Sequence, residues 1–121
     1  MPMRILLLED DQALRKLAGF VLRKSGYDVE EAVNGLEGLS ALEHGHFDLL
    51  VVDLMMPVMD GLGFLRTIRV KRGDQTPALV LTSMDSPTAE PEILAAGANA
   101  VALKPIAHAE LVNCVRNLLP S

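Results

Sequence analysis

Residues 47–61 have the sequence FDLLVVDLMMPVMDG, which contains the most strand-like segment of the chain. Phe47 to Val52 is almost continuously apolar, a pattern typical of a strand buried on both faces of a sheet. Asp53 follows this run directly. Asp60 lies where it can N-cap a helix. The apolar face predicted for that helix carries Phe64, Leu65 and Ile68.

Short apolar runs and helical patterns alternate on both sides of this stretch. The predicted strands cover residues 5–8, 27–33, 47–52, 78–81 and 100–103, and the predicted helices cover residues 14–22, 35–44, 60–68, 90–96 and 107–119. Strict alternation predicts an α/β protein with a doubly wound parallel sheet and helices on both faces. For the strand order, which the pattern alone does not dictate, we adopt the flavodoxin-like (βα)5 order 2-1-3-4-5. The second strand is half polar and therefore expected at an edge.

The 121 residues are enough for one domain, and we expect residues 1–121 to form it. A net charge of -5 argues against direct binding of nucleic acid. The single cysteine, Cys114, excludes an internal disulfide and favours a reducing, cytoplasmic setting. No signal peptide is evident, and no apolar stretch reaches the roughly 20 residues of a membrane span. On the last helix, Cys114 is expected to pack as a small apolar residue.

Chemically active side chains follow the buried strands at the point where each strand ends. These groups are Glu9-Asp10-Asp11, Asp53, Thr82-Ser83 and Lys104-Pro105. The carboxyl ends of parallel strands meet at one edge, where open α/β sheets bind ligands. Clustered carboxylates without a nearby histidine or cysteine suit a hard cation, so we expect Mg²⁺, with Mn²⁺ as an alternative ion.

This set of motifs, in order and over essentially the whole chain, resembles the response-regulator receiver domains of two-component systems. The stretch from Asp53 to Gly61 resembles the phosphorylation loop of that family. The resemblance implies that Asp53 is the phosphoacceptor and that Thr82 and Lys104 contact the phosphoryl group. It also implies a cis Lys104-Pro105 bond. The implied metal ligands are Asp10 directly, Glu9 through water, Asp53 and the main-chain carbonyl of Met55.

Three positions depart from the family pattern. Val101 replaces the usual aromatic residue three positions before the lysine, so we expect activation to pass through backbone shifts of the loop after Thr82. Pro91 lies within the expected fourth helix, and because proline is favoured in a first turn, we predict a short helix starting near Glu90. Residues 86–89 are then expected to be irregular and mobile. Ile106 stands where the family often has phenylalanine.

The sequence therefore predicts a signalling receiver rather than a classical enzyme. It would take a phosphoryl group from a histidine kinase or histidine phosphotransfer protein and switch protein–protein contacts, as a monomer or as a phosphorylation-dependent dimer. By resemblance, the first helix and the loop after Lys104 form the docking surface, with exposed Arg15 and Lys16 contributing. No output domain follows residue 121, so the chain is either a stand-alone receiver or the receiver of a longer DNA-binding or enzymatic regulator.

Other interpretations compete with this one. A magnesium-dependent aspartyl-phosphate phosphohydrolase would need a second acid two residues after Asp53, where Met55 stands. A degenerate receiver that binds partners without phosphorylation would lack an acid or the lysine, and none is missing. Asp11 is expected either to extend the acidic run or to N-cap the first helix. The three histidines lie apart from the acids and are not expected to carry phosphate; they are His44, His46 and His108.

Overall fold

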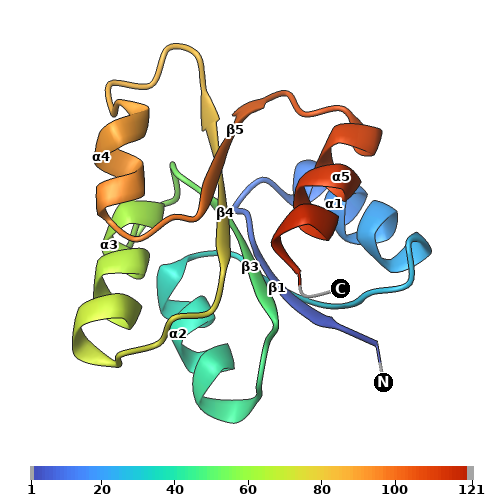
Figure 1. Cartoon of the computed structure of the whole chain (residues 1–121), viewed down its shortest axis with the longest axis horizontal. Helices are drawn as coiled ribbons and strands as arrows, with labels where there is room; N and C mark the ends of the chain where they lie inside the picture. Colours follow the sequence, from blue (N-terminus) through green and yellow to red (C-terminus); the bar gives the residue numbers. More distant parts are fainter. Residues whose placement is uncertain (1, 120–121) are drawn as a thin grey trace.

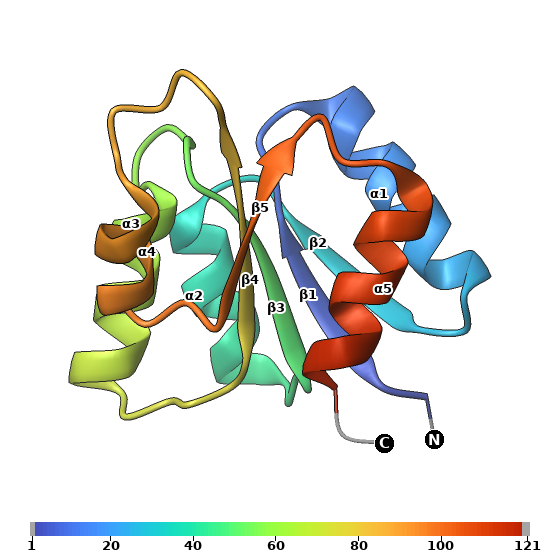
Figure 2. The ribbon, with the colours of Figure 1, turned by 45° about the horizontal axis from the view of Figure 1, so that its top comes forward.

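Five parallel strands form one sheet, with the order β2-β1-β3-β4-β5. The computed structural model describes residues 2–119; Met1, Pro120 and Ser121 lie outside the described part. The strands are β1 (Arg4–Leu8), β2 (Asp28–Ala32), β3 (Leu49–Asp53), β4 (Ala78–Ser83) and β5 (Ala100–Lys104). This confirms the doubly wound, flavodoxin-like fold (Figure 1) and places the half-polar β2 at an edge, as expected (Figure 2).

Helices cover both faces of the sheet. They are α1 (Gln12–Lys24), α2 (Gly35–His44), α3 (Gly61–Arg66), the π-helical segment η1 (Thr67–Lys71), α4 (Glu90–Ala95) and α5 (His108–Leu118). Helices α1 and α5 lie side by side on one face, and α2, α3 and α4 lie on the other (Figure 2). Because β3 lies between two covered faces, all five of its residues are buried.

Alternate residues of the central strands feed two separate hydrophobic cores. On the α2–α4 face, Leu6, Leu50 and Val52 pack with Phe64 of α3. The residues between them point to the α1–α5 face, where the core contains Ile5, Leu7, Leu49, Val51, Leu22 and Val115. The two-residue period of a strand thus divides one apolar run between two cores.

Three helices begin at side chains that accept a hydrogen bond from a backbone N–H of the first turn. The capping residues are Asp11, Asn34 and Asp60. The capping role expected of Asp60 is confirmed, and Asp11 takes the capping alternative, accepting from the N–H of Leu14 at 3.0 Å. Helix α4 starts at Glu90 with proline in its first turn, as predicted.

The structure corrects two expectations about the helices. The spacing in the sequence predicts one apolar face that carries Leu14 and Leu17 together with Leu22. Leu22 is buried, but Leu14 and Leu17 are 44% and 47% exposed. Helix α1 reaches the core through Val21 and Leu22, while its N-terminal turns line an apolar groove that faces α5. The third helix does not continue as one α-helix to Ile68. It ends at Arg66 and is followed by the π-helical segment η1.

The expectation that Arg15 is exposed is also wrong. Its side chain is only 11% exposed and lies against Glu31 of β2, whereas Lys16 is 62% exposed. A long guanidinium side chain can lie down along the protein surface when a carboxylate holds its end. The adjoining strand supplies that carboxylate here.

Candidate functional site

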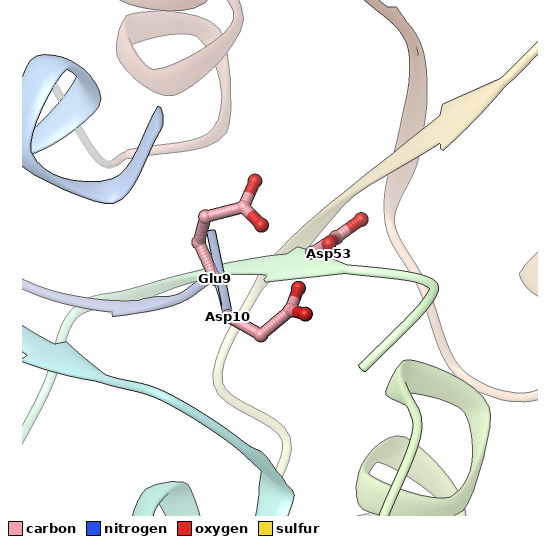
Figure 3. A group of neighbouring side chains, drawn as sticks. All are labelled: Glu9, Asp10 and Asp53. Carbon is pink, nitrogen blue, oxygen red and sulfur yellow. The ribbon is translucent and has the colours of Figure 1, made fainter. Parts of the chain in front are cut away.

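Three carboxylates converge where β1 and β3 end. Glu9 and Asp10 follow β1, Asp53 closes β3, and one oxygen of each lies within 4.8 Å of the others (Figure 3). Glu9 and Asp53 are each 4% exposed, while Asp10 is exposed. The strand order reverses between β1 and β3, so the cluster sits at the topological switch point of the sheet, where ligands of such folds bind.

Lys104, the last residue of β5, places its ammonium group between two of these carboxylates. Its Nζ lies 3.0 Å from Glu9 Oε1 and 3.3 Å from Asp53 Oδ1. Burial alone would lower the pKa of Lys104, but the carboxylates of Glu9 and Asp53 outweigh it and raise that pKa above its ordinary value. The ammonium is therefore held in its charged form beside Asp53.

Glu9 is harder to ionise in this cluster than in water, despite the neighbouring Lys104. Burial, and then the neighbouring Asp53 carboxylate, raise the pKa of Glu9 from 4.5 to about 7, against the opposing effect of Lys104. A divalent cation would remove this conflict, and a set of oxygen-only ligands suits Mg²⁺. The residues present therefore fit the metal that the sequence predicted.

Thr82 of β4 carries a hydroxyl group that the fold leaves without a partner. It is 6% exposed, and its Oγ1 has no hydrogen-bond partner within residues 2–119. It lies one residue beyond Leu81, which pairs with Asp53 in the sheet. A buried hydroxyl group without a hydrogen-bond partner costs free energy, which indicates that the Thr82 hydroxyl binds a further group when the site is occupied.

The loop after Asp53 is tied back to the strand that carries it. The Met55 N–H donates to Asp53 Oδ1 at 3.4 Å, and the Gly61 N–H donates to the Leu54 carbonyl at 2.9 Å. Val58 within this loop has a positive φ of 71°. The Asp53 backbone, the loop and the start of α3 thus form one connected unit.

Several smaller expectations are also answered by the structure. The Lys104-Pro105 peptide bond is cis, as predicted. Within the described residues, the three acids form the only group of His, Cys, Asp and Glu side chains arranged to hold a metal ion, so the histidines do not join it. Cys114 packs against the α1–α5 core, and burial raises the pKa of its thiol. No helix within residues 2–119 is long and apolar enough to cross a membrane.

Sequence reasoning missed the role of Arg15 beside the site. Its guanidinium Nη1 donates to the main-chain carbonyls of Glu9 at 3.0 Å and Asp10 at 3.4 Å. An ion pair between a basic residue of the first helix and an acid of the edge strand could have indicated this role. Glu31 is the acid of β2 that faces α1. Spacing along one helix does not reveal a contact between elements.

An acidic cluster with a lysine, set at the switch point of a flavodoxin-like sheet, defines the class as an open α/β ligand-binding domain. The family model of the response regulator receiver domain matches residues 5–116, so the chain belongs to that family of two-component signalling domains. Receiver domains of this family are signalling modules.

Curated relatives and solved structures agree with this assignment. Response regulator MprA of Mycobacterium sp. (strain KMS) is 42% identical over 119 residues, which are 98% of this chain and 51% of MprA. The chain thus spans about half the length of the curated relatives it matches. Chemotaxis protein CheY4 of Vibrio cholerae is 31% identical with a TM-score of 0.91, covering 98% of this chain and 100% of that one. The receiver domain of Francisella response regulator 1452 is 29% identical with a TM-score of 0.89, covering 96% and 95%.

Proposed function

We propose that this receiver domain accepts a phosphoryl group on Asp53 from the phosphohistidine of a histidine kinase or histidine phosphotransfer protein. The observation that supports this proposal is the environment of Asp53. Its buried carboxylate lies 3.3 Å from the Lys104 ammonium and is grouped with Glu9 and Asp10. Carboxylates serve as nucleophiles in phosphoryl transfer when neighbouring groups offset the charge of the phosphoryl oxygens.

In the proposed reaction, the phosphoryl group passes directly from the histidine nitrogen to Asp53. An Asp53 carboxylate oxygen attacks phosphorus, the bond from phosphorus to the histidine nitrogen breaks, and the leaving imidazole takes a proton from solvent water. Lys104 offsets negative charge on the phosphoryl oxygens, and the unpartnered Thr82 hydroxyl donates to one of them. Water attack on the same phosphorus breaks its bond to the Asp53 oxygen and releases inorganic phosphate and the free carboxylate, so the domain supports both its phosphorylation and its dephosphorylation.

For the metal, we propose Asp10 and Asp53 as direct carboxylate ligands, Glu9 as a ligand through water, and the Met55 main-chain carbonyl as the remaining protein ligand. Mg²⁺, or Mn²⁺ in its place, supplies positive charge to the phosphoryl oxygens when bound. The convergence of the three acids within 4.8 Å supports this set. The ligand number suits Mg²⁺, which keeps several waters and shares phosphate oxygens.

Partner docking is proposed at the α1–α5 side of the site. Exposed Leu14 and Leu17 line an apolar groove with Pro105 and Ile106, and the groove reaches Glu9 and Lys104. A partner seated there would bring its histidine close to Asp53. Phosphorylation would then switch protein–protein contacts, either of a stand-alone receiver or of a longer regulator with a DNA-binding or enzymatic part.

The alternative of another class is a phosphohydrolase that works through an aspartyl phosphate. Met55 stands two residues after Asp53, where such an enzyme would carry its general acid. A hydrolase is therefore the weaker proposal.

The test is the intact mass of the protein after incubation with acetyl phosphate and Mg²⁺. We expect the gain of one phosphoryl group in the wild type, its loss in Asp53→Asn, and its retention in Asp60→Asn, which alters a carboxylate that only caps α3. No gain in the wild type would favour a degenerate binding domain. Steady turnover of an unrelated phosphate ester would favour the hydrolase.

A further inference from the structure

The guanidinium group of Arg15 binds the backbone of Glu9 and Asp10, which form the acidic loop after β1. Arg15 Nη1 donates to the Glu9 carbonyl at 3.0 Å and to the Asp10 carbonyl at 3.4 Å. Each carbonyl lies in the rigid plane of the peptide that follows its residue. The two contacts therefore restrain the peptides on both sides of Asp10, and with them the direction in which its side chain leaves the backbone.

Arg15 is itself anchored on the edge strand. Its Nε lies 3.3 Å from Glu31 Oε1, and both side chains are 11% exposed. Glu31 also receives Arg23 Nη1 at 2.9 Å and Lys16 Nζ at 3.1 Å. Glu31 Oε1 is buried without an aligned hydrogen-bond donor within residues 2–119, so charge holds Arg15 at that oxygen. Glu31 thus shares its single negative charge among three cations, and its contact with Arg15 fixes the position of that guanidinium group.

A second contact fixes the same loop. The Glu9 N–H donates to the carbonyl of Ala32, one residue beyond Glu31 in β2. Strand β2 therefore holds the loop twice, directly through Ala32 and indirectly through Glu31 and Arg15. The acid cluster is built on β1 and β3, but its loop is oriented by the edge strand.

We propose that Arg15, anchored by Glu31, is a positioning residue of the metal site. It orients the backbone of Glu9 and Asp10 so that their carboxylates face Asp53 and bind a divalent cation. This inference rests on the proposed function, because it concerns the metal of that site. Groups that orient metal ligands without touching the metal commonly change metal affinity by about 10- to 100-fold when they are removed.

Charge and positioning predict opposite results for the removal of Arg15. By charge alone, the loss of a cation near a cation site should tighten metal binding. If Arg15 instead positions the ligands, its loss should weaken binding. Lys16 provides a matched control, since Lys16→Met removes the same charge from the adjacent residue and leaves both loop contacts in place.

The experiment is a titration of the full chain with Mn²⁺, followed by the loss of the EPR signal of the free ion, with Mg²⁺ as competitor. We expect Arg15→Met to weaken Mn²⁺ binding by about tenfold or more. Glu31→Gln should give a smaller loss in the same direction. Arg15→Lys, which keeps the charge but not the planar donor group, should bind between Arg15→Met and the wild type. Lys16→Met should bind as tightly as the wild type or more tightly.

Binding by Arg15→Met and Glu31→Gln that equals or exceeds that of the wild type would overturn the inference and leave the proposed function intact. If Arg15→Met does not fold, Arg15→Lys and Glu31→Gln decide by the same criterion. A wild-type chain that binds no Mn²⁺ would instead overturn the proposed metal site, and the inference with it. Urea unfolding of each variant separates loss of affinity from loss of fold.

Discussion

Glu9 is the acid of the cluster whose pKa is raised into the neutral range. Its pKa of about 7 arises from burial first and from the Asp53 carboxylate second, with Lys104 opposing both. A cation placed among these acids favours the ionised form of Glu9 and so displaces its proton. We therefore expect metal affinity to be linked to the charge of Glu9 near neutral pH.

We predict that Mg²⁺ binds more tightly as pH rises toward neutrality. Below pH 7 each Mg²⁺ displaces a proton from Glu9, so the affinity should rise by up to about tenfold per pH unit and level off above pH 7. Calorimetric titration with Mg²⁺ between pH 6 and pH 8 measures this slope. Glu9→Gln should bind with a flat profile over this range. An equal slope in the variant would assign the linkage to another group.

Gly61 shows how closely α3 approaches the backbone of Asp53. A Cβ at this position would lie 2.7 Å from the Asp53 carbonyl oxygen and 3.0 Å from Leu54 Cα. Both atoms belong to the backbone and cannot rotate away. A close approach between a helix start and a strand end thus requires glycine here.

Gly61→Ala should therefore lower the free energy of unfolding, by about 1–3 kcal/mol, because overpacking forces the backbone to shift. Urea unfolding measures the change. Gly63→Ala is the matched control in the same helix, since its nearest contact would be the Asp60 carboxylate at 3.2 Å, which a side-chain movement can relieve. An unchanged midpoint for Gly61→Ala would show that α3 can move away from Asp53 at little cost.

At the scale of single elements, the segment between β4 and α4 is weakly held. Its contacts include the Ser86 N–H to the Ser83 carbonyl at 3.1 Å and the Thr88 N–H to Ser86 Oγ at 3.2 Å. Met84 beside it is 85% exposed. Segments with few buried contacts open locally at low free energy. This segment is where we expect movement after Thr82 meets a phosphoryl group.

We predict that the backbone amides of Ser86, Thr88 and Ala89 exchange with solvent much faster than those of β3, in which every residue is buried. Hydrogen exchange followed by NMR resolves the two segments in one experiment. Phosphorylation of Asp53 should slow exchange near Thr82, because a phosphoryl oxygen would give the unpartnered Thr82 hydroxyl group a hydrogen-bond acceptor. Protection at 86–89 equal to that in β3, before phosphorylation, would contradict this account.

Local patterns predicted most elements because strands and helix caps depend on neighbouring residues. The run before Asp53 and the capping role of Asp60 needed no information about distant contacts. The exposure of Leu14 could not be predicted, since helical periodicity identifies a face but not where the groove beneath it opens. Contacts of Arg15 with Glu31 join segments that only the fold brings together.

Across the whole molecule, the acid cluster should make folding stability depend on pH and on metal. Without metal, the pKa of Glu9 is raised from 4.5 to about 7 in the folded protein, so the folded state holds this proton more tightly than the unfolded chain. Stability from this group is thus fully present below pH 4.5 and is lost as pH rises toward 7. The contribution is on the order of 3 kcal/mol, because one pKa unit corresponds to about 1.4 kcal/mol.

We therefore predict that the metal-free chain loses free energy of unfolding between pH 5 and pH 7, and that Glu9→Gln loses less. Over this window Glu31 does not compete, since Lys16 and Arg23 outweigh its burial and hold its pKa below 4.5. Mg²⁺ should reverse the loss at pH 7, by about 2.7 kcal/mol at a hundred times its dissociation constant, because it binds the folded state. Urea unfolding at both pH values, with and without Mg²⁺, measures all four conditions. If the metal-free chain were equally stable at pH 5 and pH 7, the pKa of Glu9 would not be raised in the folded protein.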